Sequence, residues 1–400
     1  MRDGDELEVN LPPAVARVLS GLQSTGAEAA LVGGCVRDLV RGEEPSDWDV
    51  ATSAPPEQVQ AHFPGAIWEN RFGTVTIHGA DGPAVEVTTY RIEGAYRDRR
   101  RPEEVRWGGS LGEDLSRRDF TINAMGWLPV AAGSTTGRLV DPFDGTRDLA
   151  AGVLRAVGDP DQRIAEDALR MVRAVRFATR FGFELDPATA QAIRRHAGAA
   201  RQLSGERVRD ELLRILGGNA PPSRALVLME SLGLLVILLP ELEALRGVPQ
   251  AKALPGDALD HSLRTVDALP AGSPLLRLAG LLHDLGKSST LADGHFIGHE
   301  EVGADLAEGL LRRLHLPNAD IARVVRLVRQ HMFAYTPDWT DAAVRRFVRR
   351  VGIDLLDDLF ALRRADNAAS GATEPSSGGL EELRARVDRA IASDPMVAAR

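Results

Sequence analysis

The feature that most constrains the fold is a change of hydrophobic pattern near residue 160. Before it, short runs of β-branched residues alternate with turn residues; GTVTIHG and AVEVTTYR flank an Asp-Gly-Pro turn, which predicts a β-hairpin. After it, apolar residues recur every three or four positions, as in DQRIAEDALRMVRAVRFATRFGF, which predicts one helix capped by Asp161. No convincing strand follows. We therefore expect an α+β fold, with a small head built on a few-stranded sheet and an all-helical remainder.

The chain is long enough to require more than one hydrophobic core. Its 400 residues predict two or more domains. Loop-like segments at 247–257 and 370–379 suggest boundaries inside the helical part. We expect a head at 1–150, a helical neck at 151–250, a second helical block at 258–370, and a C-terminal loop and helix at 371–400.

Composition and charge limit the cellular compartment and the kinds of partner that we expect for this chain. No apolar run approaches a membrane span, and the acidic N-terminus does not resemble a signal peptide. A single cysteine, Cys35, fits a reducing cytoplasm. The net charge of −9 argues against coating nucleic acid by bulk electrostatics, although a local basic track is compatible with it. Apart from Lys252 and Lys287 every basic side chain is arginine, the better bidentate partner for phosphate.

Two acidic residues, Asp47 and Asp49, stand one residue apart in DWDVAT. On a β-strand, residues i and i+2 point to the same face, so the two carboxylates would repel each other. A divalent cation between them would remove this repulsion, and Mg²⁺ prefers carboxylate oxygens together with substrate phosphates. Two solvated acids in a polar turn would have the same sequence. Other parts of the chain are therefore needed to distinguish a metal site from such a turn.

Two further features agree with a metal-dependent phosphate site. Glu86 lies on a second predicted strand, and three carboxylates on adjacent strands can hold two metal ions. Before the acids stands the pair Gly33-Gly34, which would let backbone N–H groups approach a phosphate at the start of a helix near Val36. Arg37, one turn into that helix, would clamp the phosphate.

Together with three later motifs, these residues resemble the class II tRNA nucleotidyltransferases and bacterial poly(A) polymerases, a family that builds or repairs the CCA end of tRNA. The resemblance spans about residues 29–235, with the motifs in the family's order: GGCVRD…DWDVAT, RRDFTINAM, DPFDGTRDL and EDALRMVRAVRFATRFGF. It implies the substrates ATP and CTP, the tRNA 3′ end as acceptor, and Mg²⁺. It also implies that Asp47 and Asp49 bind the metal and that Glu86 is the third catalytic carboxylate.

The same resemblance implies a set of nucleotide-binding residues: Gly33, Gly34, Arg37, Arg118, Asp119, Asn123, Asp167, Arg170, Arg173 and Arg176. In the family, the aspartate and arginine at the positions of Asp167 and Arg170 act as an amino-acid template for the base edges of CTP and ATP. Their spacing puts them on one face of the predicted helix, and an ordinary i,i+3 salt bridge would have the same spacing.

The segment RIEGAYRDRRRPEEVRWGGSLGEDL lies between the hairpin and the second motif. As a charge run it is typical of a solvated loop. In the family, the corresponding loop is needed for the final A addition and is shortened in enzymes that add only CC. Arg97, Asp98, Arg99 and Arg100 are present here, which favours an enzyme that can add A, either the complete CCA-adding enzyme or an A-adding one.

Histidines concentrate in the second half, where His283-Asp284 in LLHDLGK is flanked by further histidines. This pattern resembles the all-helical HD phosphohydrolase superfamily over about 258–370. Imidazole with carboxylate suits transition metals better than Mg²⁺. The resemblance implies hydrolysis of a phosphoester at RNA 3′ ends, with Lys287 neutralising a phosphate, and the metal ligands His261, His283, Asp284, His299, His331 and Asp366. An inert scaffold that only grips tRNA is the alternative.

The sequence thus predicts a nucleotidyltransferase acting on tRNA, with a second, hydrolytic centre. A poly(A) polymerase or a CC-only enzyme would carry nearly the same motifs, although the HD-type domain in place of a strongly basic C-terminal region disfavours the polymerase. The alternative from another class is a hydrolase whose head only recognises RNA ends. The intact acids in the head argue against it.

Overall fold

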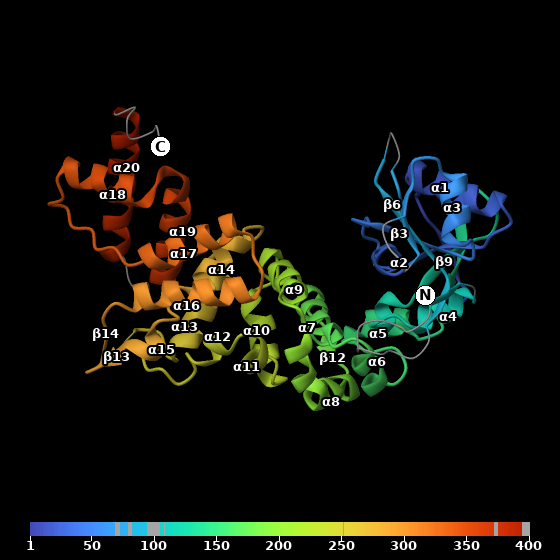
Figure 1. Cartoon of the computed structure of the whole chain (residues 1–400), viewed down its shortest axis with the longest axis horizontal. Coiled ribbons are helices and arrows are strands. Elements are labelled where there is room, and N and C mark those ends of the chain that lie inside the picture. Colours follow the sequence, from blue (N-terminus) through green and yellow to red (C-terminus); the bar gives the residue numbers. More distant parts are fainter. Residues whose placement is uncertain are drawn as a thin grey trace. The chain divides into compact units, whose positions relative to one another are not determined.

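The computed structural model describes residues 1–68, 73–78, 82–93, 105–107, 109–250, 252–371 and 375–393. The chain divides into two compact units, residues 1–174 with 181–196 and residues 175–180 with 197–400. The first unit contains a mixed β-sheet with helices, and the second is mostly helical (Figure 1). The predicted α+β class is therefore confirmed. In the described ranges, no helix combines the length and the apolar character that crossing a membrane requires.

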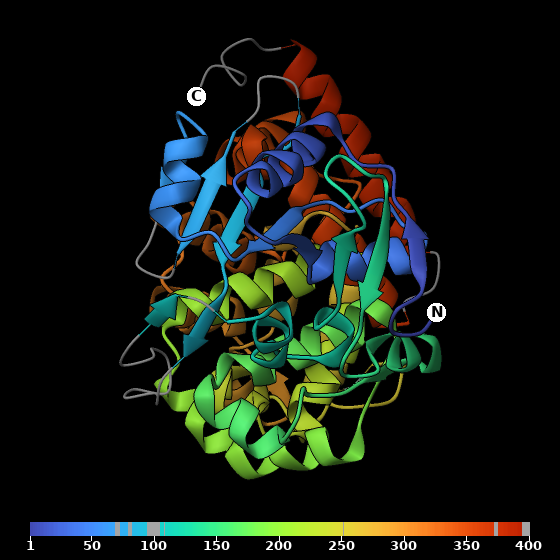
Figure 2. The same ribbon diagram turned by 90° about the vertical axis from the view of Figure 1, so that its right-hand side faces the viewer.

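Unit one is built on an eight-stranded sheet, larger than the few strands expected. Its strand order is β1-β10-β9-β2-β3-β6-β5-β4, and Figure 2 shows several of these strands side by side in blue and teal. In that order the strands are Glu6–Glu8, Thr136–Val140, Gly126–Pro129, Ala29–Val32, Trp48–Thr52, Val85–Thr89, Thr74–Ile77 and Ile67–Trp68. All neighbours are antiparallel except β3 and β6, which are parallel. The predicted β5–β6 hairpin is confirmed.

The centre of the sheet, β2 and β3, is buried on both faces because its residues alternate between two hydrophobic clusters. Leu31 and Val50 pack with α1 (Pro13–Ser24) and α3 (Pro56–His62). Their strand neighbours Ala30 and Ala51 pack on the opposite face with α4 (Leu111–Ser116). Asp49 directly precedes Val50, so its side chain leaves the sheet on the α4 face. That face is where the predicted site has to form.

Unit one contains further elements besides the sheet and the helices α1, α3 and α4. They are α2 (Gly34–Val40), β7 (Arg91–Glu93), β8 (Val105–Trp107), η1 (Thr121–Asn123), α5 (Gly145–Ala151), β11 (Val153–Leu154), α6 (Pro160–Glu166), β12 (Glu184–Leu185) and α8 (Pro187–His196). The expected single helix from Asp161 is instead two, α6 and α7 (Leu169–Phe181), and α7 contributes residues to both units. α6 is capped by Asp159, whose side chain accepts from the Asp161 N–H.

Unit two consists mainly of helices. They are η2 (Ala197–Gln202), α9 (Gly205–Gly217), α10 (Pro222–Ser231), α11 (Leu235–Leu238), α12 (Pro240–Glu243), α13 (Ala258–Ala268), α14 (Pro274–Leu282), α15 (Lys287–Thr290), α16 (His299–Arg313), α17 (Asn318–Gln330), α18 (Asp341–Val351), α19 (Ile353–Ala369) and α20 (Pro375–Ser393). α14 is buried along Leu276–Leu282 and contacts α13, α17 and α19, so it forms the centre of the bundle.

The expectation that no strand follows residue 160 is wrong in detail. β12 pairs in parallel with β11, and two further two-residue strands, β13 (Leu291–Ala292) and β14 (His295–Phe296), pair with each other. Pairs this short carry no hydrophobic alternation, so a periodicity argument has nothing to detect in them.

Candidate active site and metal centre

The glycine pair makes a tight connection between β2 and α2. Gly33 has φ = 78°, in the left-handed region that favours glycine. A Cβ at Gly33 would lie 2.4 Å from Arg118 Nη1 and 3.7 Å from Asp49 Oδ2. The missing side chain therefore lets an arginine and an aspartate approach the same stretch of backbone. α2 begins at Gly34, two residues earlier than expected.

Strand pairing brings two of the three predicted catalytic acids side by side. Asp49 and Glu86 are direct Cα partners across the parallel strands β3 and β6, so both side chains leave the same face. Asp47 lies one residue before β3 rather than within it, and Ser46 Oγ donates to its carboxylate at 3.1 Å. Within the described ranges, the groups of three or more ligand atoms that all lie within 4.8 Å of one another occur only in unit two.

Asp49 and Arg118 form the electrostatic centre of this site. Burial raises the pKa of the Asp49 carboxyl, the Arg118 guanidinium opposes this rise, and the Asp47 carboxylate adds to it. Arg118 Nη2 donates to buried Asp114 at 3.3 Å, whereas Arg118 Nε is buried with no hydrogen-bond partner among the described residues. A buried guanidinium N–H without an acceptor is costly, and an anion bound beside it would satisfy it. The sequence patterns did not indicate Asp114.

Four of the predicted nucleotide-binding residues form one hydrogen-bonded chain in unit one. Arg37 Nη1 donates to Asn123 Oδ1 at 2.6 Å, and Asn123 Nδ2 donates to Asp119 Oδ1 at 3.1 Å. Arg173 Nε donates to Asp119 Oδ2 at 2.8 Å. Burial opposes ionisation of Asp119, but Arg173 and Asn123 outweigh it and lower the pKa of this carboxyl. The chain joins α2, η1 and α7 around a carboxylate that stays charged.

Asp167 and Arg170 do not share a helix face, so the prediction from their spacing is wrong. Asp167 lies between α6 and α7, with φ = −148° and ψ = 105°, and its Oδ1 accepts from the Leu169 N–H at 3.0 Å. An aspartate that hydrogen-bonds the backbone in this way interrupts a helix that periodicity alone would continue. Arg170 Nη1 lies 2.6 Å from Glu166 Oε2 and donates to the Arg163 carbonyl at 2.7 Å. The template role of the pair stays a prediction.

The other residues expected at the nucleotide site lie elsewhere in the structure or outside the described ranges. Arg176 belongs to unit two, where its Nε donates to buried Glu211 at 2.5 Å. In the third motif, Asp148 Oδ2 accepts from Thr121 Oγ1 at 2.7 Å, so this motif supports the turn that carries Asn123. The predicted A-addition loop is not placed, because Arg97, Asp98, Arg99 and Arg100 lie outside the described residues.

Unit two gathers all six predicted metal ligands into one buried cluster, with Asp284 at its centre. The ligands come from five helices and their ends: His261, His283, Asp284, His299, His331 and Asp366. Asp284 Oδ2 lies 3.2 Å from His283 Nε2 and 3.6 Å from His261 Nε2. Asp284 Oδ1 lies 3.4 Å from His299 Nε2 and 3.8 Å from His331 Nε2. Each carboxylate oxygen thus faces a different pair of imidazoles.

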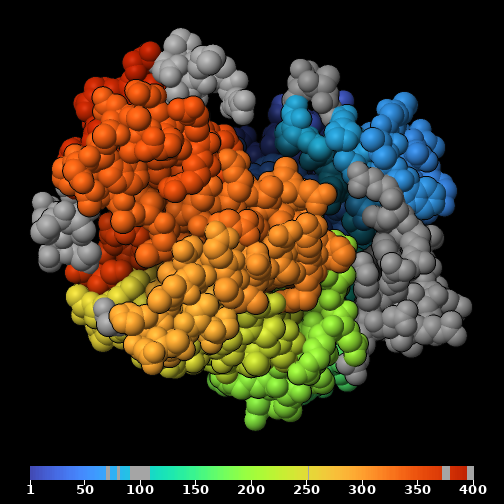
Figure 3. Space-filling view, turned by 60° about the vertical axis from the view of Figure 1, so that its left-hand side comes forward, coloured from blue at the N-terminus to red at the C-terminus, as the bar shows by residue number. Residues whose placement is uncertain are grey.

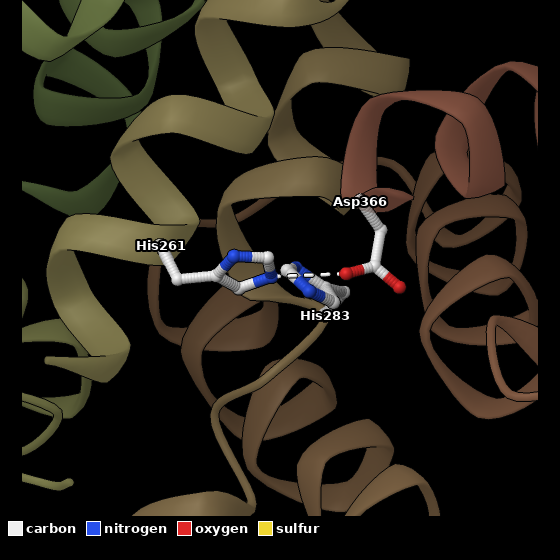
Figure 4. Close-up of side chains that lie close together, drawn as sticks. All are labelled: His261, His283 and Asp366. Carbon is white, nitrogen blue, oxygen red and sulfur yellow. Dashed lines mark ion pairs between the residues drawn. The ribbon is translucent and has the colours of Figure 1, made fainter. Parts of the chain in front are cut away.

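Two ligand groups within this cluster have the spacing of a metal site. His261, His283 and Asp366 form the first group, and His283, Asp284 and His331 form the second. Figure 4 shows the first group, with His261 Nε2 and Asp366 Oδ1 joined at 3.0 Å. In the space-filling view, orange residues of this region form part of the surface (Figure 3), whereas the ligand side chains themselves are buried.

The imidazole rings are oriented by backbone carbonyls. Nδ1 of His283 lies 2.8 Å from the Gly280 carbonyl oxygen, Nδ1 of His299 lies 2.8 Å from that of Phe296, and Nδ1 of His331 lies 2.6 Å from that of Val328. A carbonyl oxygen can only accept, so each Nδ1 carries the proton and each Nε2 lone pair faces the cluster. Hydrogen bonds of this kind fix the tautomer and the ring orientation that a metal-binding histidine needs.

The charges within the cluster are strongly coupled. Burial opposes ionisation of Asp284, but His283 and its other neighbours hold the pKa of this carboxyl well below its usual value. Burial and the neighbouring His283 lower the pKa of His331 to about 3. A neutral imidazole and an ionised carboxylate are the protonation states that bind a metal, and His331 and Asp284 are shifted toward them. Burial opposes protonation of His299, but Asp284 outweighs it and raises the pKa of that imidazole, so a metal bound there would displace a proton.

The sequence patterns also failed to indicate one cationic side chain at this centre and the segment that carries it. The stretch 247–257 resembles a linker, yet it places Gln250 and Lys252 against the cluster. Lys252 Nζ lies 2.7 Å from His261 Nε2 and 3.3 Å from Asp366 Oδ1. Gln250 Oε1 accepts from Lys287 Nζ at 3.1 Å, and Lys287 Nζ also donates to Asp284 Oδ2 at 2.6 Å. The signal that marked Lys252 was composition, because it is one of only two lysines in the chain.

Three family models match consecutive parts of the chain. They are the poly A polymerase head domain at residues 29–155, the probable RNA and SrmB-binding site of polymerase A at 182–245, and the HD domain at 259–369. In chain order they cover the β-sheet, the helices that follow it and the histidine cluster.

Individual relatives are tRNA nucleotidyltransferases that match different shares of the chain. The A-adding tRNA nucleotidyltransferase of Deinococcus radiodurans is 36% identical over 381 residues, covering 91% of this chain and 82% of the relative. The CCA-adding enzyme of Levilactobacillus brevis is 45% identical over 205 residues, and the match covers only about half of each protein, 51% and 50%. The crystal structure of the Bacillus stearothermophilus CCA-adding enzyme in complex with CTP has a TM-score of 0.68 and 30% identity, covering 95% of this chain and 83% of that one.

Proposed function

Since this chain belongs to the family of tRNA nucleotidyltransferases and poly(A) polymerases, we propose that it transfers nucleotides from ATP and CTP to the 3′ end of tRNA and releases pyrophosphate. The observation that carries the proposal is the parallel pairing of β3 with β6, which sets Asp49 beside Glu86 on the face reached by Arg118. A nucleophilic hydroxyl, a triphosphate and an acid pair are what this reaction has to bring together.

The oxygen ligands of the head fit Mg²⁺. Asp49 is a carboxylate whose ionisation is opposed by burial and by Asp47, and a bound cation would reverse that opposition. Asp47 and Asp49 would hold the ion, which would lower the pKa of the attacking hydroxyl and neutralise charge on the triphosphate. Arg118 would donate its unpartnered Nε–H to a phosphate oxygen. Glu86 would take the proton of the tRNA 3′ hydroxyl as that oxygen attacks the α-phosphate.

The base and sugar of the nucleotide would be held by the polar residues of the neighbouring motifs. Asp119 and Asn123 lie in the hydrogen-bonded chain with Arg37 and Arg173, which keeps their orientations fixed before substrate arrives. Asp167 and Arg170 would offer the base-reading groups.

The test uses three tRNAs, lacking the whole CCA end, the terminal CA or only the terminal A, each incubated with radiolabelled CTP or ATP and Mg²⁺. Label from CTP on the first two and from ATP on the third is expected for a CCA-adding enzyme. Label from neither nucleotide on any tRNA would overturn the proposed transfer. Long ladders of A on all three would indicate a poly(A) polymerase instead.

One comparison favours a narrower candidate function. The Deinococcus radiodurans relative, which matches nearly the whole chain, is named an A-adding enzyme, whereas the sequence match to the Levilactobacillus brevis CCA-adding enzyme covers about half of the chain. Addition of the terminal A alone would appear in the same experiment as label from ATP on the third tRNA only. Incorporation of C into the shorter tRNAs would exclude this narrower function.

We further propose that unit two hydrolyses phosphoesters at RNA 3′ ends with a divalent transition metal. The donor set of four imidazoles and two carboxylates fits such a metal, and three of the rings already aim their Nε2 lone pairs into the cluster. The metal would be held by His261, His283, Asp284, His299, His331 and Asp366, and would supply a hydroxide nucleophile at neutral pH. Lys287, fixed by Asp284 and Gln250, would face the phosphate charge.

A further inference from the structure

Both lysines of this chain lie at the same place in the structure, the histidine cluster of unit two. Of 48 basic side chains, only Lys252 and Lys287 are lysines, and both place their ammonium groups on the histidine cluster of unit two. At both positions the cation is therefore an ammonium and not a guanidinium. An ammonium is a compact point charge on a flexible stem, whereas a guanidinium is a planar fork that is hard to relocate. Both lysines therefore present a small, flexible cation to the cluster.

Lys252 uses a lone pair of His261 that a bound metal would also need. Its Nζ lies 2.7 Å from His261 Nε2 and 3.3 Å from Asp366 Oδ1, and these two atoms are 3.0 Å apart. An ammonium has no acceptor, so the bond to His261 uses the single lone pair of Nε2. A metal bound by His261 needs the same lone pair. The contact with Lys252 and the coordination of a metal by His261 are mutually exclusive.

Lys287 is chemically different although it lies at the same cluster. Its Nζ donates to Asp284 Oδ2 at 2.6 Å and to Gln250 Oε1 at 3.1 Å. A carboxylate has about four lone-pair sites on its two oxygens, so Asp284 can accept from Lys287 and bind a metal together. Lys287 therefore adds positive charge near the cluster without blocking a ligand, which makes it the matched control for Lys252.

We propose that Lys252 is a phosphate-binding residue of the hydrolytic centre, held by His261 and Asp366 until a metal takes those two ligands and releases its ammonium to the substrate. The inference rests on the proposed hydrolytic function of unit two. Lys252 then has opposite effects on the binding of metal and of phosphate. It competes with the metal at the group His261, His283 and Asp366, and it favours phosphate once the metal is bound. Lys252 can turn toward a substrate, because its side chain is only partly buried and it lies outside any helix or strand.

The first measurement is the binding of Mn²⁺ to the metal-free full chain by calorimetry, for wild type, Lys252→Met and Lys287→Met. Methionine keeps the length of the side chain and removes the charge. Both variants lose one positive charge near the cluster, so any purely electrostatic gain in affinity should be similar. The broken hydrogen bond to His261 adds to it only in Lys252→Met, which should bind Mn²⁺ about tenfold more tightly than Lys287→Met.

The second measurement is the binding of inorganic phosphate to the manganese-loaded proteins. Lys252→Met should bind phosphate about tenfold more weakly than wild type, the opposite sign to its effect on the metal. Equal Mn²⁺ affinity in the two variants, or unchanged phosphate binding in Lys252→Met, would overturn the role of Lys252 and leave the metal centre standing. No Mn²⁺ binding to any of the three proteins would overturn the hydrolytic centre itself, and this inference with it.

Discussion

Gly33 shows how a single missing Cβ shapes the site. Alanine there would adopt a left-handed φ, at a cost of about 1 kcal/mol, and would also push Arg118 away from Asp49. We predict that Gly33→Ala lowers the rate of nucleotide addition about 100-fold, the loss typical of a catalytic group displaced by about 1 Å. Gly26→Ala is the matched control, because Gly26 has φ = 81° and a Cβ added there would meet no atom within 4 Å. Equal activity in steady-state assays of both variants would contradict the steric argument.

At Asp119, the stability of the fold depends on charge. Its pKa is lowered in the folded protein, so its contribution is present above the unfolded value of about 4 and is lost as pH falls from there toward the folded pKa. We predict that Asp119→Asn costs about 2 kcal/mol at pH 7, less than a fully buried pair because Arg173 is partly exposed. Thermal unfolding between pH 3 and 7 should also show a shallower loss of stability on acidification than in wild type. Asp5→Asn removes an exposed carboxylate and should leave the profile unchanged.

At the scale of elements, the break between α6 and α7 depends on Asp167. Its carbonyl accepts from the Arg170 N–H and its side chain from the Leu169 N–H, the arrangement of an N-cap. We predict that Asp167→Ala destabilises the protein by about 1 kcal/mol, whereas Asp167→Asn keeps the acceptor oxygen and the stability. If Asp167 also reads the base, Asp167→Asn should alter the ratio of CTP to ATP incorporation without shifting the unfolding temperature. An unchanged ratio would remove it from the template.

How far the sequence could predict these elements depends on the kind of signal. The hairpin and the partnership of Asp49 with Glu86 followed from strand alternation, which fixes which face a side chain leaves. The α6–α7 break did not follow, because an aspartate inside an apolar period looks the same whether it caps or continues a helix. Lys252 was missed for another reason. It stands on a segment without periodicity, and only the packing of several helices brings that segment to the histidines.

At the scale of the whole molecule, each compact unit carries its own candidate chemistry. We predict that Asp49→Ala abolishes nucleotide addition and leaves phosphoester hydrolysis intact, whereas Asp284→Ala does the reverse, because each residue lies in a different unit.

Mn²⁺ at about 100 times its Kd should stabilise unit two by about 2.7 kcal/mol, which raises its unfolding temperature by roughly 5–10 °C. Differential scanning calorimetry should show this shift in wild type and in Asp49→Ala.

The control for that shift is Asp284→Ala, which removes the carboxylate common to the imidazole pairs and should remove the response to Mn²⁺. A shift of the same size in Asp284→Ala would place the metal outside the histidine cluster. Loss of both activities in either single variant would indicate that the two units do not act separately.

The parallel neighbours β3 and β6 also bear on how the chain assembles. β5 and β6 are adjacent in the sequence and can zip together as a hairpin early, but β6 reaches β3 only after a loop of more than 30 residues has closed. The pairings of β2 with β9 and of β1 with β10 close still longer loops, of more than 90 and more than 120 residues, so the acid pair is expected to form before the sheet is complete. Nucleotide addition by this unit therefore requires at least the long-range pairing of β3 with β6.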